Sequence, residues 1–120
     1  METTESVLHH HESAFVEQDL GKLMENYTEE SILVTNMGTF DGRNGIKRLF
    51  GDLFADLSQS GTTITVTQRT VKGMFAYLVW QAETVDNIYE LATGTFYISD
   101  GMISFQTLTV KISSQETFEG

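Results

Sequence analysis

The chain has 120 residues, of which 17 are acidic and 7 are basic, giving a net charge of −10 at neutral pH. Affinity for nucleic acid comes mainly from Lys and Arg side chains that neutralise phosphates, so this charge argues against nucleic acid and anionic membrane as partners. The hydrophobic content of 40% is enough for one core. We therefore expect one domain over residues 1–120.

Several classes of site are excluded by what the sequence lacks. There is no cysteine, and hence no disulfide, thiolate nucleophile or Cys-ligated metal. No phosphate-binding glycine loop, HExxH or nucleophile-elbow motif is present, so we expect no cofactor. The first residues, METTESV, do not resemble a secretory signal, and the longest apolar run is far shorter than a membrane span of about 20 residues. The expected compartment is the cytoplasm.

Three amphipathic helices are predicted in the first half of the chain. The first begins near Thr3 or Thr4, and the second is capped by Asp19 and ends at Tyr27. The third carries the strongest apolar stripe. The inward residues of the three helices are Val7, His11, Ala14 and Phe15, then Leu20, Leu23, Met24 and Tyr27, and finally Ile46, Leu49, Phe50, Leu53, Phe54 and Leu57.

Residues 62–112 are predicted to form a sheet, because they are rich in Thr, Val, Ile, Tyr and Phe and are broken at regular intervals by turn residues. The pairs Lys72-Gly73, Asp86-Asn87 and Asp100-Gly101 each resemble a two-residue hairpin loop, and the last is a strong type I′ signal. Counting outward from these loops assigns each side chain to a face of the sheet.

The two predicted faces differ in chemistry. The first collects Ile64, Val66, Phe75, Tyr77, Val79, Phe96, Ile98, Ile103 and Phe105, with Glu83, Glu90 and Lys111 at one end. The second collects Leu78, Trp80, Ala82, Tyr89, Leu91, Thr93, Thr95, Tyr97, Gln106, Leu108, Val110 and Ile112. Apolar walls with a few polar groups are typical of a small-molecule site, so the second face is predicted to hold a ligand. The plainer first face is predicted to form a homodimer.

The order of elements in DLGKLMENYTEESILVTNMGTFDGRNGIKRLF, from Asp19 to Phe50, followed by long strands, resembles the nuclear transport factor 2-like superfamily, which includes SnoaL-like polyketide cyclases and ketosteroid isomerases. The resemblance implies an α+β, cystatin-like cone, with three N-terminal helices packed on a curved, mainly antiparallel sheet. It also implies a conical pocket between the helices and the concave face, and a convex face that commonly packs against a second subunit.

The isomerase branch implies three specific residues, and none of them stands at the matched position. Its mechanism uses a Tyr on the first helix, an Asp just after the first strand and an Asp on a later strand. The match places His11, Thr35 and Thr93 at those positions. Because a hydroxyl near its ordinary pKa is not a general base at neutral pH, that mechanism is not expected here. His11 is the candidate catalytic residue, since it alone of the three titrates near pH 7.

The predicted ligand-binding residues are Tyr27, Thr35, Trp80, Thr93, Thr95, Tyr97 and Gln106. Alternatives stay open for several of them. His11 is either catalytic or a hydrogen-bonded core histidine, and Trp80 is either a ligand platform or core. Gln106 is the hardest to explain as core, because an amide in an apolar cavity requires partners.

Two clusters receive structural interpretations. Consecutive helical residues point about 100° apart, so His9, His10 and His11 do not ligate one metal, and no metal site is expected. The predicted row of Glu83, Glu90 and Lys111 is read as a salt bridge, with a catalytic dyad as the alternative.

The leading functional hypothesis is binding of a small hydrophobic molecule in the conical pocket, with SnoaL-like isomerase, cyclase or hydratase turnover as an extension. The alternative is a non-catalytic dimerisation or partner-binding module of the same fold.

Overall fold

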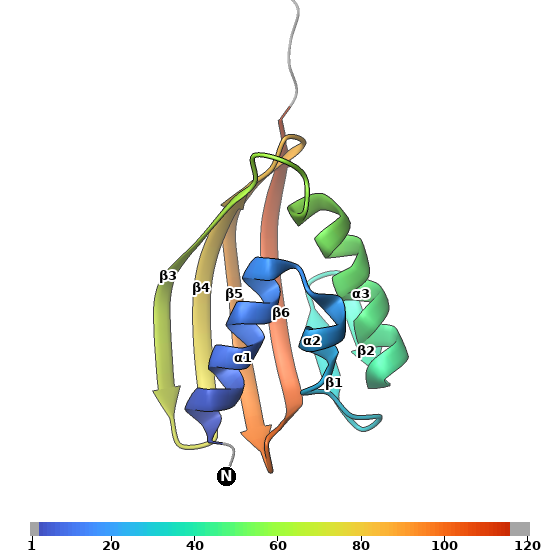
Figure 1. The fold of residues 1–120 in the computed structure, drawn as a ribbon, viewed down its shortest axis with the longest axis vertical. Helices are drawn as coiled ribbons and strands as arrows, with labels where there is room; N and C mark the ends of the chain where they lie inside the picture. Colours follow the sequence, from blue (N-terminus) through green and yellow to red (C-terminus); the bar gives the residue numbers. More distant parts are fainter. Residues whose placement is uncertain (1–2, 116–120) are drawn as a thin grey trace, which may run out of the picture.

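The computed structural model describes residues 3–115, in which three helices cover one face of a curved six-stranded sheet (Figure 1). The helices are α1 (Thr4–Glu17), α2 (Leu20–Met24) and α3 (Gly42–Leu57). The strands are β1 (Ile32–Thr35), β2 (Gly38–Asp41), β3 (Thr63–Lys72), β4 (Phe75–Glu83), β5 (Asn87–Ser99) and β6 (Met102–Ser114). The predicted α+β cone is confirmed.

The strands lie in the order β2-β1-β6-β5-β4-β3, and the sheet is not closed. β1 pairs with β6 in parallel, and the other four pairs are antiparallel. Helix α1 lies over the β3–β5 side of the sheet, whereas α3 lies over the side of β1, β2 and β6 (Figure 1). The helical face of the sheet is called the concave face below, and the opposite one the convex face.

The predicted helix starts are confirmed. Thr3 caps α1 through a capping box with Ser6, and the Asp19 carboxylate accepts a hydrogen bond of 3.0 Å from the Lys22 backbone N–H at the start of α2. The predicted end of the second helix is wrong, because α2 ends at Met24 and Tyr27 lies in the following turn. On α3 the predicted stripe faces the core, as Ile46, Phe50, Phe54 and Leu57 are buried and Leu49 and Leu53 are half-buried.

One of the three predicted hairpin loops is confirmed. Ser99 pairs with Met102, which leaves Asp100-Gly101 as the loop, and both loop residues have positive φ angles of 54° and 76°. A type I′ turn needs positive φ at both central positions, which Gly adopts freely and Asp tolerates.

The other two loops are wrong. Lys72 pairs with Phe75, so the turn between β3 and β4 is Gly73-Met74. Glu83 pairs with Ile88, so four residues, 84–87, separate the paired positions, and the last of them, Asn87, already belongs to β5. Its Thr84 hydroxyl accepts backbone hydrogen bonds from Asp86 and Asn87, a side-chain turn that a count of loop residues does not detect.

Three β-bulges change which side chains face the core. The extra residues are Thr67 in β3, Glu90 in β5 and Ser104 in β6. Each bulge reverses the in-out alternation on one side of it. The concave face therefore gains residues that were predicted for the convex face: Ile64, Val66, Phe96, Ile98 and Ile103.

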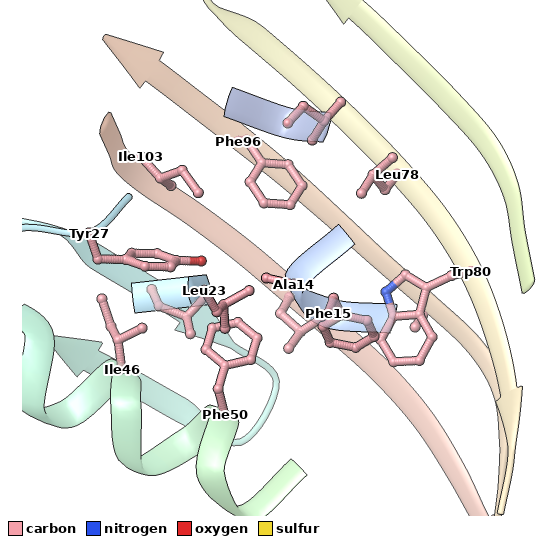
Figure 2. Packing of buried hydrophobic residues seen from close by; sticks show 14 of the residues in the cluster. Ala14, Phe15, Leu23, Tyr27, Ile46, Phe50, Leu78, Trp80, Phe96 and Ile103 are labelled. Carbon is pink, nitrogen blue, oxygen red and sulfur yellow. The ribbon is translucent and has the colours of Figure 1, made fainter. Parts of the chain in front are cut away.

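The core lies between the helices and the concave face. Phe15, Phe50, Phe96 and Trp80 converge there, and the rings of Phe15 and Trp80 are 5.0 Å apart at their centroids (Figure 2). The described helices are each too short or too polar to cross a membrane.

Candidate functional site

A small cavity lies inside the cone, between α1 and the concave face. Its volume is about 30 Å³, measured as the space open to the centre of a water molecule, which is enough for one or two waters. We call it the inner cavity. Its lining residues are His11, Glu12, Phe15, Val16, Phe50, Ile64, Val66, Leu78, Trp80, Gly94, Phe96, Gln106 and Leu108.

The position of the inner cavity follows from one missing side chain. Gly94 on β5 pairs with Leu78 on β4 and with Leu108 on β6, so a cross-strand row of inward leucines is interrupted at its centre. A Cβ atom at Gly94 would lie 3.4 Å from the ring of Phe96 and 3.3 Å from the carbonyl oxygen of Thr107. Because glycine has no side chain, the Phe96 ring fits against the strand at this position, and the space beside the ring stays empty.

His11 points into this apolar environment from α1. Its ring lies within 5.0–6.4 Å, centroid to centroid, of four aromatic rings, those of Phe15, Tyr27, Phe50 and Phe96. Burial, with a smaller contribution from the adjacent His10, lowers the pKa of His11 to about 3. The imidazole is therefore neutral at pH 7. In residues 3–115, its Nδ1 is the one buried side-chain nitrogen or oxygen without a hydrogen-bond partner.

Tyr27 and Gln106 form a buried pair beside His11. The Tyr27 hydroxyl donates a hydrogen bond to the side-chain carbonyl of Gln106, which is 2% exposed. Burial raises the pKa of Tyr27, so the phenol stays protonated and remains a donor. Tyr27 is thus the hydrogen-bond partner that the buried amide of Gln106 was expected to need.

The rim of the inner cavity carries an ion pair. Arg69 on β3 donates to the carboxylates of Glu12 at 3.0 Å and Glu5 at 2.7 Å, both on α1. These hydrogen bonds raise the pKa of Arg69 and tie the open edge of the sheet to the helix. Glu12 is among the cavity-lining residues, so the rim presents a carboxylate whose charge is offset by Arg69.

A second hollow opens on the other side of Leu108, between α3 and the distal half of β6. Its volume by the same measure is about 330 Å³, and we call it the outer groove. The lining residues are Met37, Phe40, Leu49, Asp52, Leu53, Tyr89, Leu108, Val110 and Ile112. Asp52, which is exposed, provides the carboxylate on this rim.

The structure brings three of the predicted site residues together at the inner cavity, namely His11, Trp80 and Gln106, with Tyr27 bonded to Gln106. Thr35 lies elsewhere. Its hydroxyl donates to the Gly38 carbonyl and accepts from the Met37 N–H, so it closes the β1–β2 turn.

Thr93, Thr95 and Tyr97 are not in the cavity. After the bulge at Glu90 their side chains lie on the convex face, where the ring of Tyr97 packs against that of Phe75 in a tilted arrangement, with 5.3 Å between the centroids. Their predicted place on the ligand face is therefore wrong, as is that of Leu91, which is 48% exposed.

The predicted charge row is wrong in part. Glu83 lies opposite Ile88 rather than Glu90, so there is no facing carboxylate dyad between β4 and β5 at this position. Lys111 does lie near Glu90, with 4.0 Å between the charged atoms, and both side chains are exposed. Over residues 3–115, no group of three His, Asp or Glu side chains is placed to hold a metal ion.

Sequence reasoning missed Phe96 and Gly94 as parts of the site. Phe96 was assigned to the other face, and Gly94 was assigned to neither face. The signal that was available is the Gly94-Thr95-Phe96 spacing, since a glycine two residues before an aromatic on one face leaves space for the ring.

With this geometry established, comparison with known proteins identifies the family. The model of the SnoaL-like domain matches residues 7–107. The chain belongs to the SnoaL-like family. No curated protein matches the sequence.

Solved structures share the fold of this SnoaL-like protein at low sequence identity. A nuclear transport factor 2-like protein of unknown function from Mesorhizobium loti has a TM-score of 0.76 and 20% identity, over 90% of each chain. SalBIII, described as an epoxide hydrolase/cyclase-like enzyme in pyran ring formation of the polyether salinomycin, has a TM-score of 0.75 and 14% identity, over 93% of this chain and 95% of its own. A de novo designed protein with a curved β-sheet has a TM-score of 0.75 and 13% identity, over 90% and 84%. Because a designed protein shares the fold, the fold alone does not carry the function.

Proposed function

We propose that this SnoaL-like protein, taken as one domain over residues 1–120, binds a small, uncharged, mainly apolar molecule at the inner cavity. The observation that carries the proposal is His11, which lines a mainly apolar hollow and whose buried Nδ1 lacks a hydrogen-bond partner among the described residues. A buried polar atom without a partner costs about 1–3 kcal/mol, and a ligand hydroxyl or carbonyl would remove that cost. Gln106 adds a second polar group from the sheet side of the cavity.

The charge class of the ligand follows from the lining residues. Neither the inner cavity nor the outer groove has a Lys or Arg among its lining residues, and each has one carboxylate, Glu12 or Asp52. With a net charge of −10 on the chain, a carboxylate or phosphate ligand would be repelled. An alcohol, ketone or lactone of modest size suits both hollows.

The proposal extends to turnover only in a limited form. A base with a pKa of about 3 is nearly always unprotonated at pH 7 but drives proton abstraction poorly. His11 is therefore suited to hydrogen-bond and orient a polar group, and isomerase or cyclase chemistry would depend on that polarisation. Similarity to SalBIII, described as epoxide hydrolase/cyclase-like, supports turnover of the cyclase type without assigning a substrate.

Native mass spectrometry of freshly purified protein tests the proposal, together with fluorescence of Trp80, which lines the inner cavity and is the one tryptophan of the chain. Propanol should shift the emission saturably, while propionate, of similar size but charged, should not. His11→Leu should weaken propanol binding roughly tenfold through the lost hydrogen bond. His9→Leu, on the exposed side of α1, is the matched control. Equal responses to propanol and propionate, or none to either, would refute the proposal.

A second candidate function is assembly through the convex face, and a specific observation favours it. Phe75, Leu91 and Phe105 are 58%, 48% and 38% exposed on that face, close to Tyr97. Exposed apolar side chains in this number favour a homodimer contact. The predicted contact is revised, because Phe96 is interior and does not take part.

Sedimentation tests this second candidate. Phe105→Glu should dissociate the dimer, since the contact would bury an unpaired charge. Thr67→Glu, on the edge strand β3, is the control. A wild-type monomer at micromolar concentration would exclude it.

A further inference from the structure

Leu108 is the one residue that lines both the inner cavity and the outer groove. On β6 the inward side chains follow one another as Gln106, Leu108 and Val110. Gln106 lines only the inner cavity and Val110 only the outer groove. The two hollows are therefore consecutive along the strand, with the Leu108 side chain between them.

The facing helix repeats this division. On α3, Phe50 lines the inner cavity, whereas Leu49 and Leu53 line the outer groove. The boundary between the two hollows is therefore formed by the Leu108 side chain on the sheet and by one turn of α3 on the helical side. Leu108 is 5% exposed, so it fills the space between sheet and helix rather than facing solvent.

The volumes of the two hollows show what each of them lacks as a ligand site. Ligand pockets usually have volumes of about 300–1,000 Å³. The inner cavity, about 30 Å³, holds the polar groups but little of a ligand, and the outer groove, about 330 Å³, has the volume but lacks His11 and Gln106. Neither hollow alone is a complete site for a molecule larger than a short alcohol.

From this arrangement we infer that the two hollows are halves of one elongated site and that Leu108 sets the length of ligand it accepts. The inference rests on the proposed function. The polar end of the ligand would occupy the inner cavity, and its apolar chain would extend toward the outer groove. Leu108 limits that chain unless its side chain rotates away, so it is a specificity-determining residue and takes no part in chemistry.

A chain-length series tests the inference. Straight-chain primary alcohols from methanol to octanol are titrated into full-length protein, and binding is followed by amide chemical shifts. For wild type, affinity should rise about fourfold per added methylene, the value of its burial, and then stop rising when the chain reaches Leu108. In Leu108→Ala the rise should continue to longer alcohols, with octanol gaining at least tenfold over wild type.

Two further variants separate an effect on ligand length from a general loss of core packing. Leu33→Ala deletes the same atoms from the neighbouring strand β1, at a buried side chain that lines neither hollow, and should keep the wild-type length limit. Leu108→Val is the milder variant if Leu108→Ala does not fold, and it should shift the limit in the same direction.

The outcomes are distinguishable. If wild type binds short alcohols but Leu108→Ala and Leu108→Val keep the same limit, the inference is overturned and the proposed function stands. If wild-type affinity rises without a limit to octanol, Leu108 is no barrier and the inference is also overturned. If wild type binds no alcohol, the proposed function itself fails.

Discussion

Tyr27 donates a hydrogen bond to Gln106 across 79 residues of sequence, and the bond joins the turn after α2 to the middle of β6 inside the cone. Both side chains are almost fully buried. The bond fixes the orientation of the Gln106 amide, and hence the polar surface that Gln106 presents to the inner cavity. Removing only one partner of such a buried hydrogen bond destabilises the protein, because the other partner is left buried and unsatisfied.

Tyr27→Phe should destabilise the protein by about 1–3 kcal/mol, because it leaves the Gln106 carbonyl buried without a donor. Urea unfolding measures the change. Adding Gln106→Leu should restore part of the loss, since both polar partners are then gone. Tyr77→Phe, on the convex face, is the control and should be nearly neutral. Strictly additive losses in the double variant would show that the two side chains are not coupled.

His11 should make stability depend on pH. Its folded pKa of about 3 lies below the ordinary value of 6.5, so between these values the unfolded chain binds a proton that the folded protein does not. The free energy of unfolding should therefore fall as pH drops below 6.5, by at most about 1.4 kcal/mol per pH unit from this group. His11→Leu should flatten the slope between pH 7 and pH 5, whereas His9→Leu should not. Equal slopes in all three proteins would show that His11 is not a buried neutral imidazole.

Asp56 should hold the β4–β5 connection against α3. Its carboxylate accepts hydrogen bonds from Tyr89 at 2.7 Å, Gln59 at 2.8 Å, Thr84 at 2.9 Å and Asn87 at 3.0 Å. Partial burial opposes ionisation, but these four donors outweigh it and lower the pKa of Asp56 below its usual 3.8. Asp56→Asn should cost about 1–2 kcal/mol near neutral pH, since it weakens charge-assisted bonds in a partly exposed site.

The Asp56 contribution has a definite pH window. Because the folded pKa is depressed, the contribution is present above pH 3.8 and is lost as pH falls through the lower folded pKa. Asp56→Asn should therefore differ most from wild type near neutral pH and least in strong acid. Asp52→Asn, one turn earlier and exposed, is the control. Hydrogen exchange of residues 84–87 reports the local effect, and unchanged protection in Asp56→Asn would contradict the assigned role.

Gly94→Ala should narrow the inner cavity. The new methyl group would lie 3.3–3.4 Å from Thr107 and Phe96, so these neighbours must give way by a few tenths of an ångström and the methyl group takes up space beside the Phe96 ring. We expect a loss of stability of about 1 kcal/mol and a several-fold weaker response of Trp80 fluorescence to propanol. Gly51→Ala in α3 is the control, because an added Cβ there would lie 3.8 Å from Leu20, an ordinary contact, and it should be neutral or stabilising. Unchanged propanol binding in Gly94→Ala would move the binding site away from this hollow.

The helices and the Asp100-Gly101 turn were predictable because each has a local cause. A capping side chain, an apolar stripe of helical period and two positive φ angles depend on a few adjacent residues. The same holds for His11, which follows from the stripe on α1, and for Trp80, which lies on β4, where no extra bulge residue interrupts the alternation.

The faces of β3, β5 and β6 were not predictable in the same way. Thr67, Glu90 and Ser104 are ordinary residues for a strand, and nothing in their neighbourhood marks them as the extra residue of a bulge. Because the side-chain period of a strand is two, each unmarked bulge exchanged the faces beyond it. This is why Thr93, Thr95 and Tyr97 were placed inside and Phe96 outside.

The central claim is that an uncharged polar group of a small ligand bonds the unpaired nitrogen of His11, and nitrogen-15 NMR of the imidazole rings tests it most directly. Titration with propanol should shift the Nδ1 resonance of His11 saturably, while the rings of His9 and His10 stay unchanged and propionate has no effect. A His11 resonance that does not move at propanol concentrations that saturate the Trp80 signal would contradict the claim.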